Sequence, residues 1–565
     1  MRSILQNIYG NPKGDLAFSR ISVTLDAFLE KNQPGKTTPF SESDTILITY
    51  GDSVLREGEP SLQTLHHFLD SHADDLFSGL HILPFYPYSS DDGFSITDFF
   101  NVRSELGSWA DIGSLGKRFR LMVDLVANHI SADNSWFKKY LADQKGFENL
   151  AIEVDPSTDL SMVSRPRSQP LLTEFIKRSD RRVHLWTTFS ADQVDLNYHS
   201  LDVLENMVQV LLFYVSQGAK IIRLDAIAYL WKEIGTACIH LPQTHGMVRL
   251  FRSILDRVAP QVALVTETNV PHDENIRYFG SGHDEAQMVY NFTLPPLLLH
   301  ALATGGARVL SKWLMTLSAP FPETTFLNFT ASHDGIGVRP LEGILPPSEI
   351  NELADRVCRN GGRVSSRSCT NGSKRPYEFN ITYFDALKDP GVAKDPFHVA
   401  RFLASQAVAL VLPGVPAIYI HSLLGSRNWA AGVDATGQAR TINREKLSAD
   451  TIALELANPQ TIRARVFQAY RNMIQIRVRQ PAFHPGAGMQ VHDLDDRVLT
   501  IQRYCHDQTL YALINLSSER LTIDLPIAEK DLVLTDLLSG ERYKAKAISM
   551  PPYEVLWLES VPNLS

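Results

Sequence analysis

Eight short apolar runs rich in β-branched residues recur along the chain, and each is followed by a stretch with helical periodicity. They span residues 45–51, 79–85, 119–129, 219–226, 262–268, 288–292, 325–333 and 417–422. Strands that alternate with helices form parallel sheets, whose strands are buried on both faces and therefore lack polar alternation. Eight such units predict a closed (β/α)8 barrel rather than an open sheet.

The rest of the chain is arranged around this predicted barrel, which we place at residues 45–487. Residues 1–44 have a helical pattern and predict an N-terminal extension, whereas the short strands and turns of 488–565 predict an antiparallel β domain. The connections 131–200 and 335–385, after the third and seventh strands, are too long for ordinary barrel loops. We expect these insertions to form subdomains that help to build a site.

The overall composition excludes several classes of function. The formal net charge of the 565 residues is -9, and Lys and Arg are scattered among acidic residues, so a nucleic-acid partner is not expected. The uncharged stretch 402–420 is interrupted by Pro413 and Pro416, which predicts a buried helix, a turn and a strand rather than a membrane span.

The N-terminus has no continuous apolar segment and no cleavage site, so it is not expected to be a secretory signal. The four cysteines are widely spaced, without metal-ligand spacing, and are expected to be reduced thiols. We therefore predict a cytoplasmic protein, either a monomer or a homodimer, that acts on small molecules.

Polar residues stand at the carboxyl ends of several predicted strands, the edge of a (β/α)8 barrel where catalytic groups gather. They are Asp91, Asn128, His129, Arg223, Asp225, Glu267, His333 and Asp334. One such residue alone is usually a cap or a satisfied core group, but three carboxylates at one edge are hard to attribute to chance. No HxH or HExxH spacing is present, so we predict no metal and no cofactor.

Three carboxylates and an arginine are suited to glycosidic bond cleavage with retention of configuration. One carboxylate must be ionised to attack, and a second, roughly 5 Å away, must hold a proton for the leaving oxygen. Arg223 and Asp225 are two residues apart in their strand, so their side chains point to the same face. The positive charge of Arg223 should therefore favour the ionised form of Asp225. Glu267 has no cation beside it in sequence, so burial should raise its pKa.

Four motifs in this order resemble the signature regions of the α-amylase superfamily, glycoside hydrolase family 13. They are "DLVANH" (124–129), "IIRLDA" (221–226), "TET" (266–268) and "ASHD" (331–334). Further stretches resemble its sucrose-phosphorylase branch, among them "HILPFYPYSSDDGF" (81–94), "RPRSQP" (165–170), "LPGVPAIYI" (412–420) and "RTINR" (440–444).

The resemblance implies a role for each matching residue. Asp225 would be the nucleophile, Glu267 the general acid and then base, and Asp334 the third carboxylate, which binds sugar hydroxyls in the transition state. The residues that match donor-sugar positions are Asp91, Phe94, His129, Phe189, Arg223, His333 and Arg440, with Phe94 and Phe189 as apolar walls, and Gln193 is a further expected substrate-binding residue. Arg167 and Tyr377 match phosphate-contacting positions, with Tyr229 nearby.

The segment "KRPYEFN" (374–380) departs from sucrose phosphorylases, because Arg375 and Glu378 replace an aspartate and a glutamine around the tyrosine. An arginine suits an acceptor that carries a carboxylate. Together with "LWTTFSADQVDLNY" (185–198) and "LLGSRN" (423–428), this makes the chain most similar to the glucosylglycerate phosphorylase subgroup. That implies reversible phosphorolysis of 2-O-α-glucosyl-D-glycerate to α-D-glucose 1-phosphate and D-glycerate.

Other functions stay open at this point. A glucosylglycerol or sucrose phosphorylase would use the same mechanism with another acceptor, and Arg375 could instead form a surface ion pair with Glu378 or Asp385. A hydrolase or transglucosidase is disfavoured by Arg167 in the loop "RPR". A non-catalytic binding barrel is disfavoured because Asp225, Glu267 and Asp334 are all present.

Overall fold

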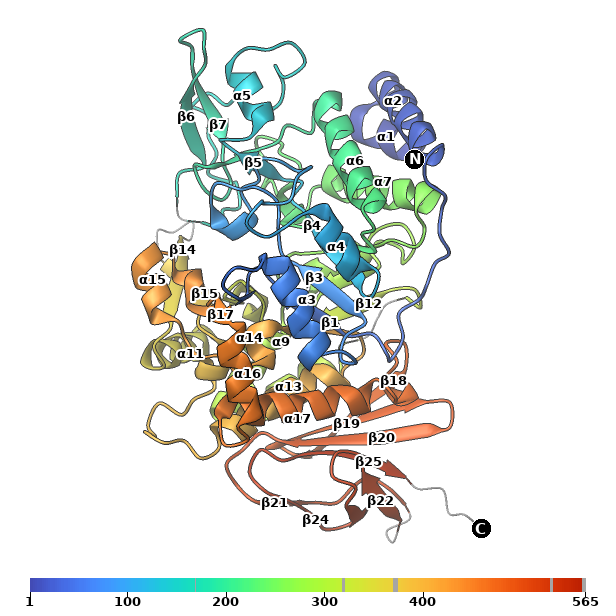
Figure 1. The fold of residues 1–565 in the computed structure, drawn as a ribbon, viewed down its shortest axis with the longest axis vertical. Coiled ribbons are helices and arrows are strands. Elements are labelled where there is room, and N and C mark those ends of the chain that lie inside the picture. Colours follow the sequence, from blue (N-terminus) through green and yellow to red (C-terminus); the bar gives the residue numbers. More distant parts are fainter. Residues whose placement is uncertain (168, 318–320, 369–373, 529–531, 561–565) are drawn as a thin grey trace.

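The fold is a closed barrel of eight parallel strands in a computed structural model, which describes residues 1–167, 169–317, 321–368, 374–528 and 532–560 (Figure 1). The strands are β1 (Ile46–Thr49), β3 (Gly79–Ile82), β4 (Arg120–Leu125), β9 (Ile221–Leu224), β10 (Ala263–Thr266), β11 (Met288–Tyr290), β12 (Thr325–Asn328) and β16 (Val415–Tyr419). Each lies inside one of the predicted runs except β16, which begins two residues earlier. The predicted (β/α)8 barrel is confirmed.

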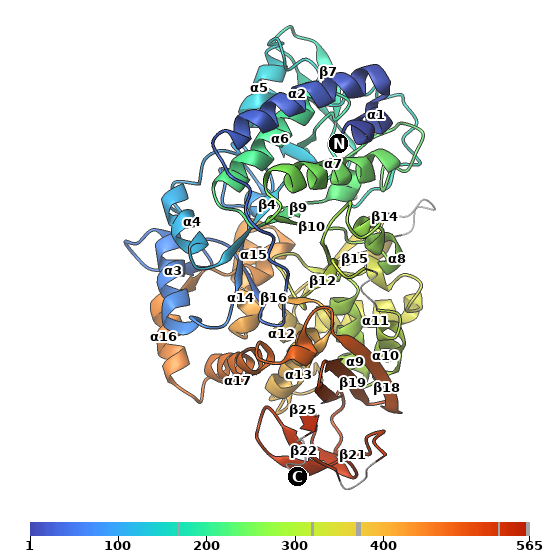
Figure 2. The same ribbon diagram turned by 90° about the vertical axis from the view of Figure 1, so that its right-hand side faces the viewer.

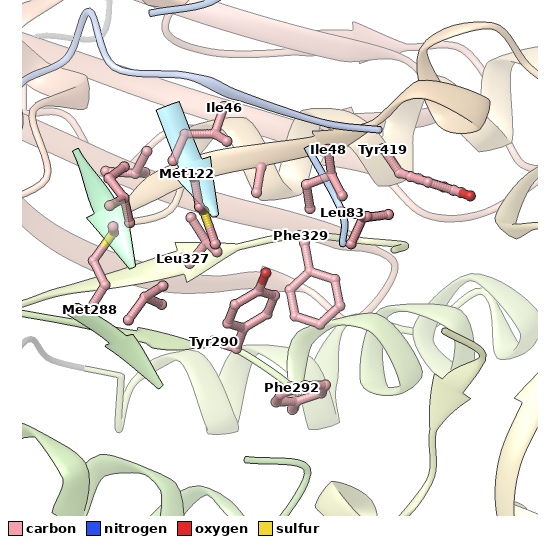
Figure 3. Close-up of a cluster of buried hydrophobic side chains, with 14 of the residues drawn as sticks. Ile46, Ile48, Leu83, Met122, Met288, Tyr290, Phe292, Leu327, Phe329 and Tyr419 are labelled. Carbon is pink, nitrogen blue, oxygen red and sulfur yellow. The ribbon is translucent and has the colours of Figure 1, made fainter. Parts of the chain in front are cut away.

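The barrel strands are apolar because almost all of their residues are buried. Figure 3 shows part of this core, in which Ile46, Met122, Met288 and Leu327 come from four different strands. Their side chains fill the barrel interior, as expected for a packed core rather than a pore. The strands therefore hold their carboxyl ends, where the polar residues stand, in a fixed arrangement.

Helices form the outer layer of the barrel. The main ones are α3 (Ser61–His72), α4 (Trp109–Gly116), α6 (Leu201–Ser216), α7 (Pro242–Val258), α9 (Leu294–Thr304), α10 (Arg308–Leu314), α13 (His398–Val411), α16 (Ala449–Ala457) and α17 (Ile462–Arg477). α6 begins after Ser200 as its sequence indicates, although the Ser200 side chain makes no capping hydrogen bond. Gly218 follows α6 with φ +97°, a conformation that favours glycine and turns the chain toward β9.

Both long insertions build small sheets beside the barrel. The first contains α5 (Ser135–Leu141), the antiparallel pair β5 (His129–Ser131) and β8 (Gln193–Asp195), and the hairpin β6 (Leu172–Ile176) and β7 (Arg182–Trp186). The second contains α11 (Pro347–Arg359) and the sheet β13–β15–β14, formed by β13 (Ile336–Gly337), β15 (Lys374–Asn380) and β14 (Arg363–Ser368). Both insertions follow strand ends, so they extend the same edge of the barrel.

The N-terminal residues form two helices, α1 (Arg2–Tyr9) and α2 (Asn11–Leu29). They pack on the outer helices α6 and α7 (Figure 2). The hydroxyl of Tyr9 donates to the carbonyl of Tyr198, and the Tyr9 ring lies edge-on to Trp231 at 5.8 Å. The extension is thus in contact with the end of the first insertion and with the segment that follows β9.

The chain ends in a six-stranded antiparallel sheet of order β18–β19–β20–β25–β22–β23 and the pair β21–β24. Its strands are β18 (Gly488–Asp495), β19 (Val498–Cys505), β20 (Gln508–Asn515), β21 (Leu521–Ile523), β22 (Val533–Asp536), β23 (Arg542–Lys544), β24 (Ile548–Met550) and β25 (Val555–Ser560). The predicted C-terminal β domain is confirmed. β18, β23 and β24 were not predicted, because β18 has no fully buried residue and the other two have only three residues each.

Two buried arginines donate to main-chain carbonyls near this β domain, and one of them, Arg503, joins the domain to the barrel. Arg503 of β19 donates to the carbonyls of Val411, His484 and Gly488, and Arg477 of α17 donates to those of Leu410, Asp44, Gly414 and Phe483. Neither forms an ion pair within the described ranges, and burial lowers the pKa of Arg503 to about 9. Arg503 therefore supplies hydrogen bonds to carbonyls on both sides of the junction.

The uncharged stretch 402–420 forms the end of α13, a turn and β16, as predicted. Across the described ranges, no helix combines the length and the apolar composition needed to cross a bilayer. Cys238, Cys358 and Cys505 are free thiols, and Cys369 lies outside the described residues.

We expect Arg503→Met to loosen the junction between the barrel and the β domain. The substitution removes the hydrogen bonds from the guanidinium group to these carbonyls, and hydrogen bonds to a charged group contribute about 1.5–3 kcal/mol each. Thermal unfolding followed by circular dichroism should show a lower midpoint. The matched control is Arg520→Met, because Arg520 is exposed in the same domain. Equal midpoints for the two variants would contradict this account of the junction.

Candidate active site

Three carboxylates lie together in a pocket of about 80 Å³ at the carboxyl ends of the barrel strands. Asp225 directly follows β9, Glu267 directly follows β10, and Asp334 follows β12 after a short loop. The same pocket is lined by Asp91, Phe94, His129, Arg167, Phe189, Gln193, Tyr229, His333, Tyr377, Glu378 and Arg440. The structure therefore brings together the predicted site residues except Arg223 and Arg375.

Arg223 lies beneath the pocket instead of lining it, and its side chain is 3% exposed. Its Nη1 atom is 2.8 Å from Oδ1 of Asp225 and 2.5 Å from Oδ1 of Asp124, and its Nη2 atom is 3.9 Å from Oε1 of Glu267. That Arg223 holds the sugar ring stays a prediction, since its guanidinium group faces the carboxylates in this structure. Arg223 compensates and orients the carboxylates that face the pocket.

Asp225 and Glu267 are coupled through Arg223 and through their burial. Burial raises the pKa of Asp225 to about 7, although Arg223 acts in the opposite direction. Burial likewise raises the pKa of Glu267 to about 7, against the effect of Arg223. Arg223 lowers the pKa of Asp225, as expected, but burial and the charge of Asp124 raise that pKa by more.

The pair therefore retains a proton near neutral pH, and the distances favour Glu267 as the residue that holds it. Arg223 donates a hydrogen bond to Asp225 at 2.8 Å but only approaches Glu267 at 3.9 Å. Glu267 accepts one hydrogen bond, at 3.0 Å, from the backbone N–H of Ala226. This bond places the Glu267 carboxylate next to the residue that follows Asp225.

Asp334 has the opposite electrostatic environment. Burial alone would raise its pKa, but Arg440, His333 and Arg444 together hold the pKa of Asp334 well below its usual range. Nη1 of Arg440 lies 2.5 Å from Oδ1 of Asp334, and Arg440 also binds Glu378 through two hydrogen bonds of 2.8 and 3.2 Å. Asp334 is therefore ionised, and one arginine fixes it to Glu378.

Aromatic rings and histidines form one wall of the pocket. The rings of Phe94 and His333 are stacked at 4.8 Å, and Phe189 contacts both His129 at 5.3 Å and Tyr229 at 5.5 Å. Nε2 of His129 lies 3.0 Å from the carbonyl of Phe94. Because these rings support one another, they offer a rigid apolar surface of the kind that packs against the face of a sugar ring.

Three non-glycine residues in or next to the pocket have strained, left-handed backbone conformations. Ala226, directly after Asp225, has φ +47°, and Asp91 and Asp92 have φ +53° and +46°. A residue with a Cβ atom loses roughly 1–2 kcal/mol in this left-handed region. Such strain persists only where surrounding contacts enforce it, and here the Ala226 N–H bond to Glu267 and the Asp92–Arg444 ion pair of 2.6 Å do so.

A β-bulge in β15 explains why two neighbouring residues face the same pocket. Ser365 of β14 pairs with Glu378, but Ser366 pairs with Pro376, so Tyr377 is an extra residue without a partner. Adjacent side chains of a regular strand point to opposite faces, and a bulge redirects one of them. Tyr377 and Glu378 therefore both line the pocket.

Arg375 lines a second, wider pocket that adjoins the first. This outer pocket has a volume of about 520 Å³, and it shares Arg167, Tyr229 and Tyr377 with the inner pocket. Within the described residues, Arg375 forms no ion pair, because Glu378 is paired with Arg440 and Asp385 lies near Arg427. The surface ion pair considered for Arg375 is therefore not formed.

The family of the chain follows from comparisons with known proteins. Residues 75–324 match the family "Alpha amylase, catalytic domain". The glucosylglycerate phosphorylase of Escherichia coli (strain K12) is 44% identical over 98% of this chain and 99% of its own length. The chain belongs to the α-amylase family, among the glucosylglycerate phosphorylases. The resemblance described from the sequence motifs is confirmed.

More distant relatives of this α-amylase family member agree with that placement. The glucosylglycerol phosphorylase of Marinobacter adhaerens is 29% identical over 88% of this chain and 97% of its own length. The crystal structure of sucrose 6F-phosphate phosphorylase from Thermoanaerobacter thermosaccharolyticum superposes with a TM-score of 0.75 at 24% identity, covering 89% of this chain and 98% of that one. The latter likeness shows the fold.

Two charged residues that support the site without lining the pocket, Asp124 and Arg444, were not predicted from the sequence. Asp124 pairs with Arg223 across β4 and β9 in direct register, and its Oδ2 atom accepts a hydrogen bond from Nε2 of His81 at 2.7 Å. Arg444 donates to the carbonyl of His333 at 2.8 Å and pairs with Asp92. A signal existed for both, because Asp124 is a lone charge in an apolar strand and Arg444 ends the motif "RTINR".

In the described part of the chain, no three His, Cys, Asp or Glu side chains are arranged so that they could hold a metal ion. The groups that the pocket offers are carboxylates, guanidinium groups, hydroxyls and aromatic faces. These suit a sugar that is oriented by hydrogen bonds and attacked by a carboxylate.

The location of the shared proton can be tested directly. We expect infrared difference spectra of the wild type to show a protonated carboxyl group that is lost as the pH rises through about 7, because burial raises both pKa values. Glu267→Gln should lose the band of the Glu267 carboxyl group, and any band that remains at pH 6 then belongs to Asp225, whose pKa burial also raises. Asp225→Asn should keep the Glu267 band but lose it at a lower pH, because the charge of Asp225 raises the pKa of Glu267. A wild-type band that is unchanged in Glu267→Gln would place the proton on Asp225 instead.

Proposed function

We propose that this protein is a retaining phosphorylase that converts 2-O-α-glucosyl-D-glycerate and inorganic phosphate into α-D-glucose 1-phosphate and D-glycerate, reversibly. The observation that carries this proposal is the combination of a glycosidase set of three carboxylates with arginine at the pocket mouth, where Arg167 and Tyr377 link the inner and outer pockets. The likeness to a glucosylglycerate phosphorylase over nearly the whole chain supports the same acceptor.

In the first half of the reaction, the Asp225 carboxylate attacks the anomeric carbon while Glu267 gives its proton to the glycosidic oxygen. The bond to glycerate breaks, and a β-glucosyl ester on Asp225 forms. The ionised Asp334 binds sugar hydroxyls, which become more acidic as positive charge develops on the ring. Phe94 and Phe189 provide the apolar faces against which the ring packs.

In the second half, a phosphate oxygen attacks the same carbon and the Asp225 ester bond breaks. Glu267, now ionised, accepts the proton of monohydrogen phosphate, so two inversions give the α-configured product. Arg167 supplies positive charge at the mouth. Burial raises the pKa of Tyr377, so its hydroxyl stays protonated and can donate to a phosphate oxygen.

The acceptor choice rests on Arg375. Its guanidinium has no ion-pair partner within the described residues and lines the outer pocket beside Tyr377. A free guanidinium next to the leaving-group position suits the carboxylate of glycerate through a bidentate contact. Neutral acceptors such as glycerol or fructose would leave this charge unused.

We further propose that the enzyme acts in the cytoplasm, as a monomer or homodimer, without metal or organic cofactor. Free thiols stay reduced in that compartment. Its partners in this proposal are the small-molecule substrates alone.

The acceptor assignment predicts how Arg375→Gln behaves. Loss of a charge-assisted hydrogen bond of about 1.5–3 kcal/mol should lower kcat/KM for glucosylglycerate by roughly 10–100-fold, with a much smaller effect on glucosylglycerol. Glucose 1-phosphate release is measured for both glucosides and for sucrose. A wild-type preference for sucrose would contradict the role of Arg375. Equal release of free glucose with and without phosphate would contradict phosphorolysis.

The roles of the two coupled carboxylates predict different responses to a substrate that needs no acid. We expect Glu267→Gln to lose roughly 10²–10⁴-fold in activity on glucosylglycerate but to retain formation of the glucosyl-enzyme from α-D-glucosyl fluoride, because fluoride leaves without a proton. Asp225→Asn should lose both reactions. Mass spectrometry of the intact protein and fluoride release distinguish the two outcomes. Glucosylation of Asp225→Asn would show that another residue is the nucleophile.

A further inference from the structure

The outer pocket has a wall of positive charge. Its described lining includes five arginines, Arg165, Arg167, Arg339, Arg367 and Arg375, and no aspartate or glutamate. The chain as a whole has a formal net charge of -9. Such a concentration of one sign in an otherwise acidic protein creates a local field that attracts small anions.

Only part of this charge is balanced by neighbouring carboxylates. Arg339 lies 3.4 Å from Glu274, and Arg367 pairs with Glu342. Arg165, Arg167 and Arg375 form no ion pair within the described ranges. The outer pocket therefore carries an excess of cations that a bound anion would reduce.

Arg367 and Arg375 face each other across the β14–β15 ladder. Arg367 is the direct register partner of Arg375, so the two guanidinium groups project from the same face of the hairpin. Like charges directly opposite one another destabilise a β-ladder. The Nε–H of Arg367 is also buried without an acceptor in the described part of the chain. The hairpin thus keeps an unfavourable arrangement that an oxyanion between the two side chains would relieve.

We propose that Arg367 and Arg375 form an anion clamp, the Arg367–Arg375 clamp, which binds the carboxylate or phosphate group of a substrate beside the mouth of the inner pocket. This inference rests on the proposed phosphorylase reaction and adds Arg367 to the residues that recognise its anionic substrates. The shared chemistry is a small oxyanion, and D-glycerate and inorganic phosphate are its two possible sources. The clamp holds the anion in the outer pocket, and Arg167 and Tyr377 then face it from the shared wall.

The clamp can be tested with a neutral donor, so that only the acceptor is charged. α-D-Glucosyl fluoride forms the glucosyl-enzyme, and transfer to D-glycerate, inorganic phosphate, glycerol or water is measured on the same intermediate. We expect Arg367→Gln to lower kcat/KM for D-glycerate, phosphate or both about tenfold, mainly through KM. Transfer to glycerol and water should be unchanged. Arg367→Lys, which keeps the charge, should recover most of the loss.

The matched control is Arg363→Gln, because Arg363 is an exposed residue of the same strand that lies outside the pocket lining and carries the same charge. A loss with only one anion identifies which source the clamp binds. The clamp is overturned if Arg367→Gln matches Arg363→Gln with both anions, or if transfer to glycerol and water falls equally. A wild type that transfers to glycerol or water but to neither anion would contradict the proposed function, and the clamp with it.

Discussion

The buried guanidinium group of Arg223 is the constraint on which the site depends. With almost no contact with water, its charge must be compensated by carboxylates, since an unpaired buried charge costs several kcal/mol. Asp124, Asp225 and Glu267 do this from the neighbouring strands β4 and β9 and from the residue after β10. The charged groups of the site therefore come together only when the strands pair in the correct register. A shift of β9 against β4 by one residue would separate Arg223 from Asp124 and point Asp225 away from the pocket.

The barrel could be predicted because buried parallel strands leave continuous apolar runs that recur with helices between them. The same reasoning failed for β18, whose residues are at least partly exposed and include His492 and Asp493. The prediction of a barrel also placed the three carboxylates at one edge, since the carboxyl ends of the barrel strands meet there. The two-residue spacing of Arg223 and Asp225 predicted that both side chains point to the same face of the strand, but not that the guanidinium group of Arg223 is buried among carboxylates. That position depends on Asp124 in the adjacent strand, and pairing between strands far apart in sequence is not visible in a local pattern.

The acceptor side shows a second limit of sequence reasoning. Motif spacing places Arg375, Tyr377 and Glu378 near one another, but spacing alone cannot assign them to different pockets. The bulge at Tyr377 does so, leaving Arg375 in the outer pocket while Glu378 pairs with Arg440. Pro376 was a usable signal, because proline within a strand is confined to edges and bulges.

The phosphorylase chemistry creates an electrostatic conflict that the two pockets answer together. A phosphate dianion must approach a site that contains Asp225, Glu267 and Asp334, and repulsion between unit charges 4 Å apart rises from about 1 kcal/mol in water to about 4 kcal/mol near a protein surface. When phosphate attacks, Asp225 is esterified and carries no charge, and Arg440 offsets the charge of Asp334, so the ionised Glu267 is the carboxylate that still repels the anion. Water, being neutral, would need none of this. The arginines of the outer pocket therefore have a physical reason to stand beside a glycosidase-type site, since they lower the cost of bringing an anion to it.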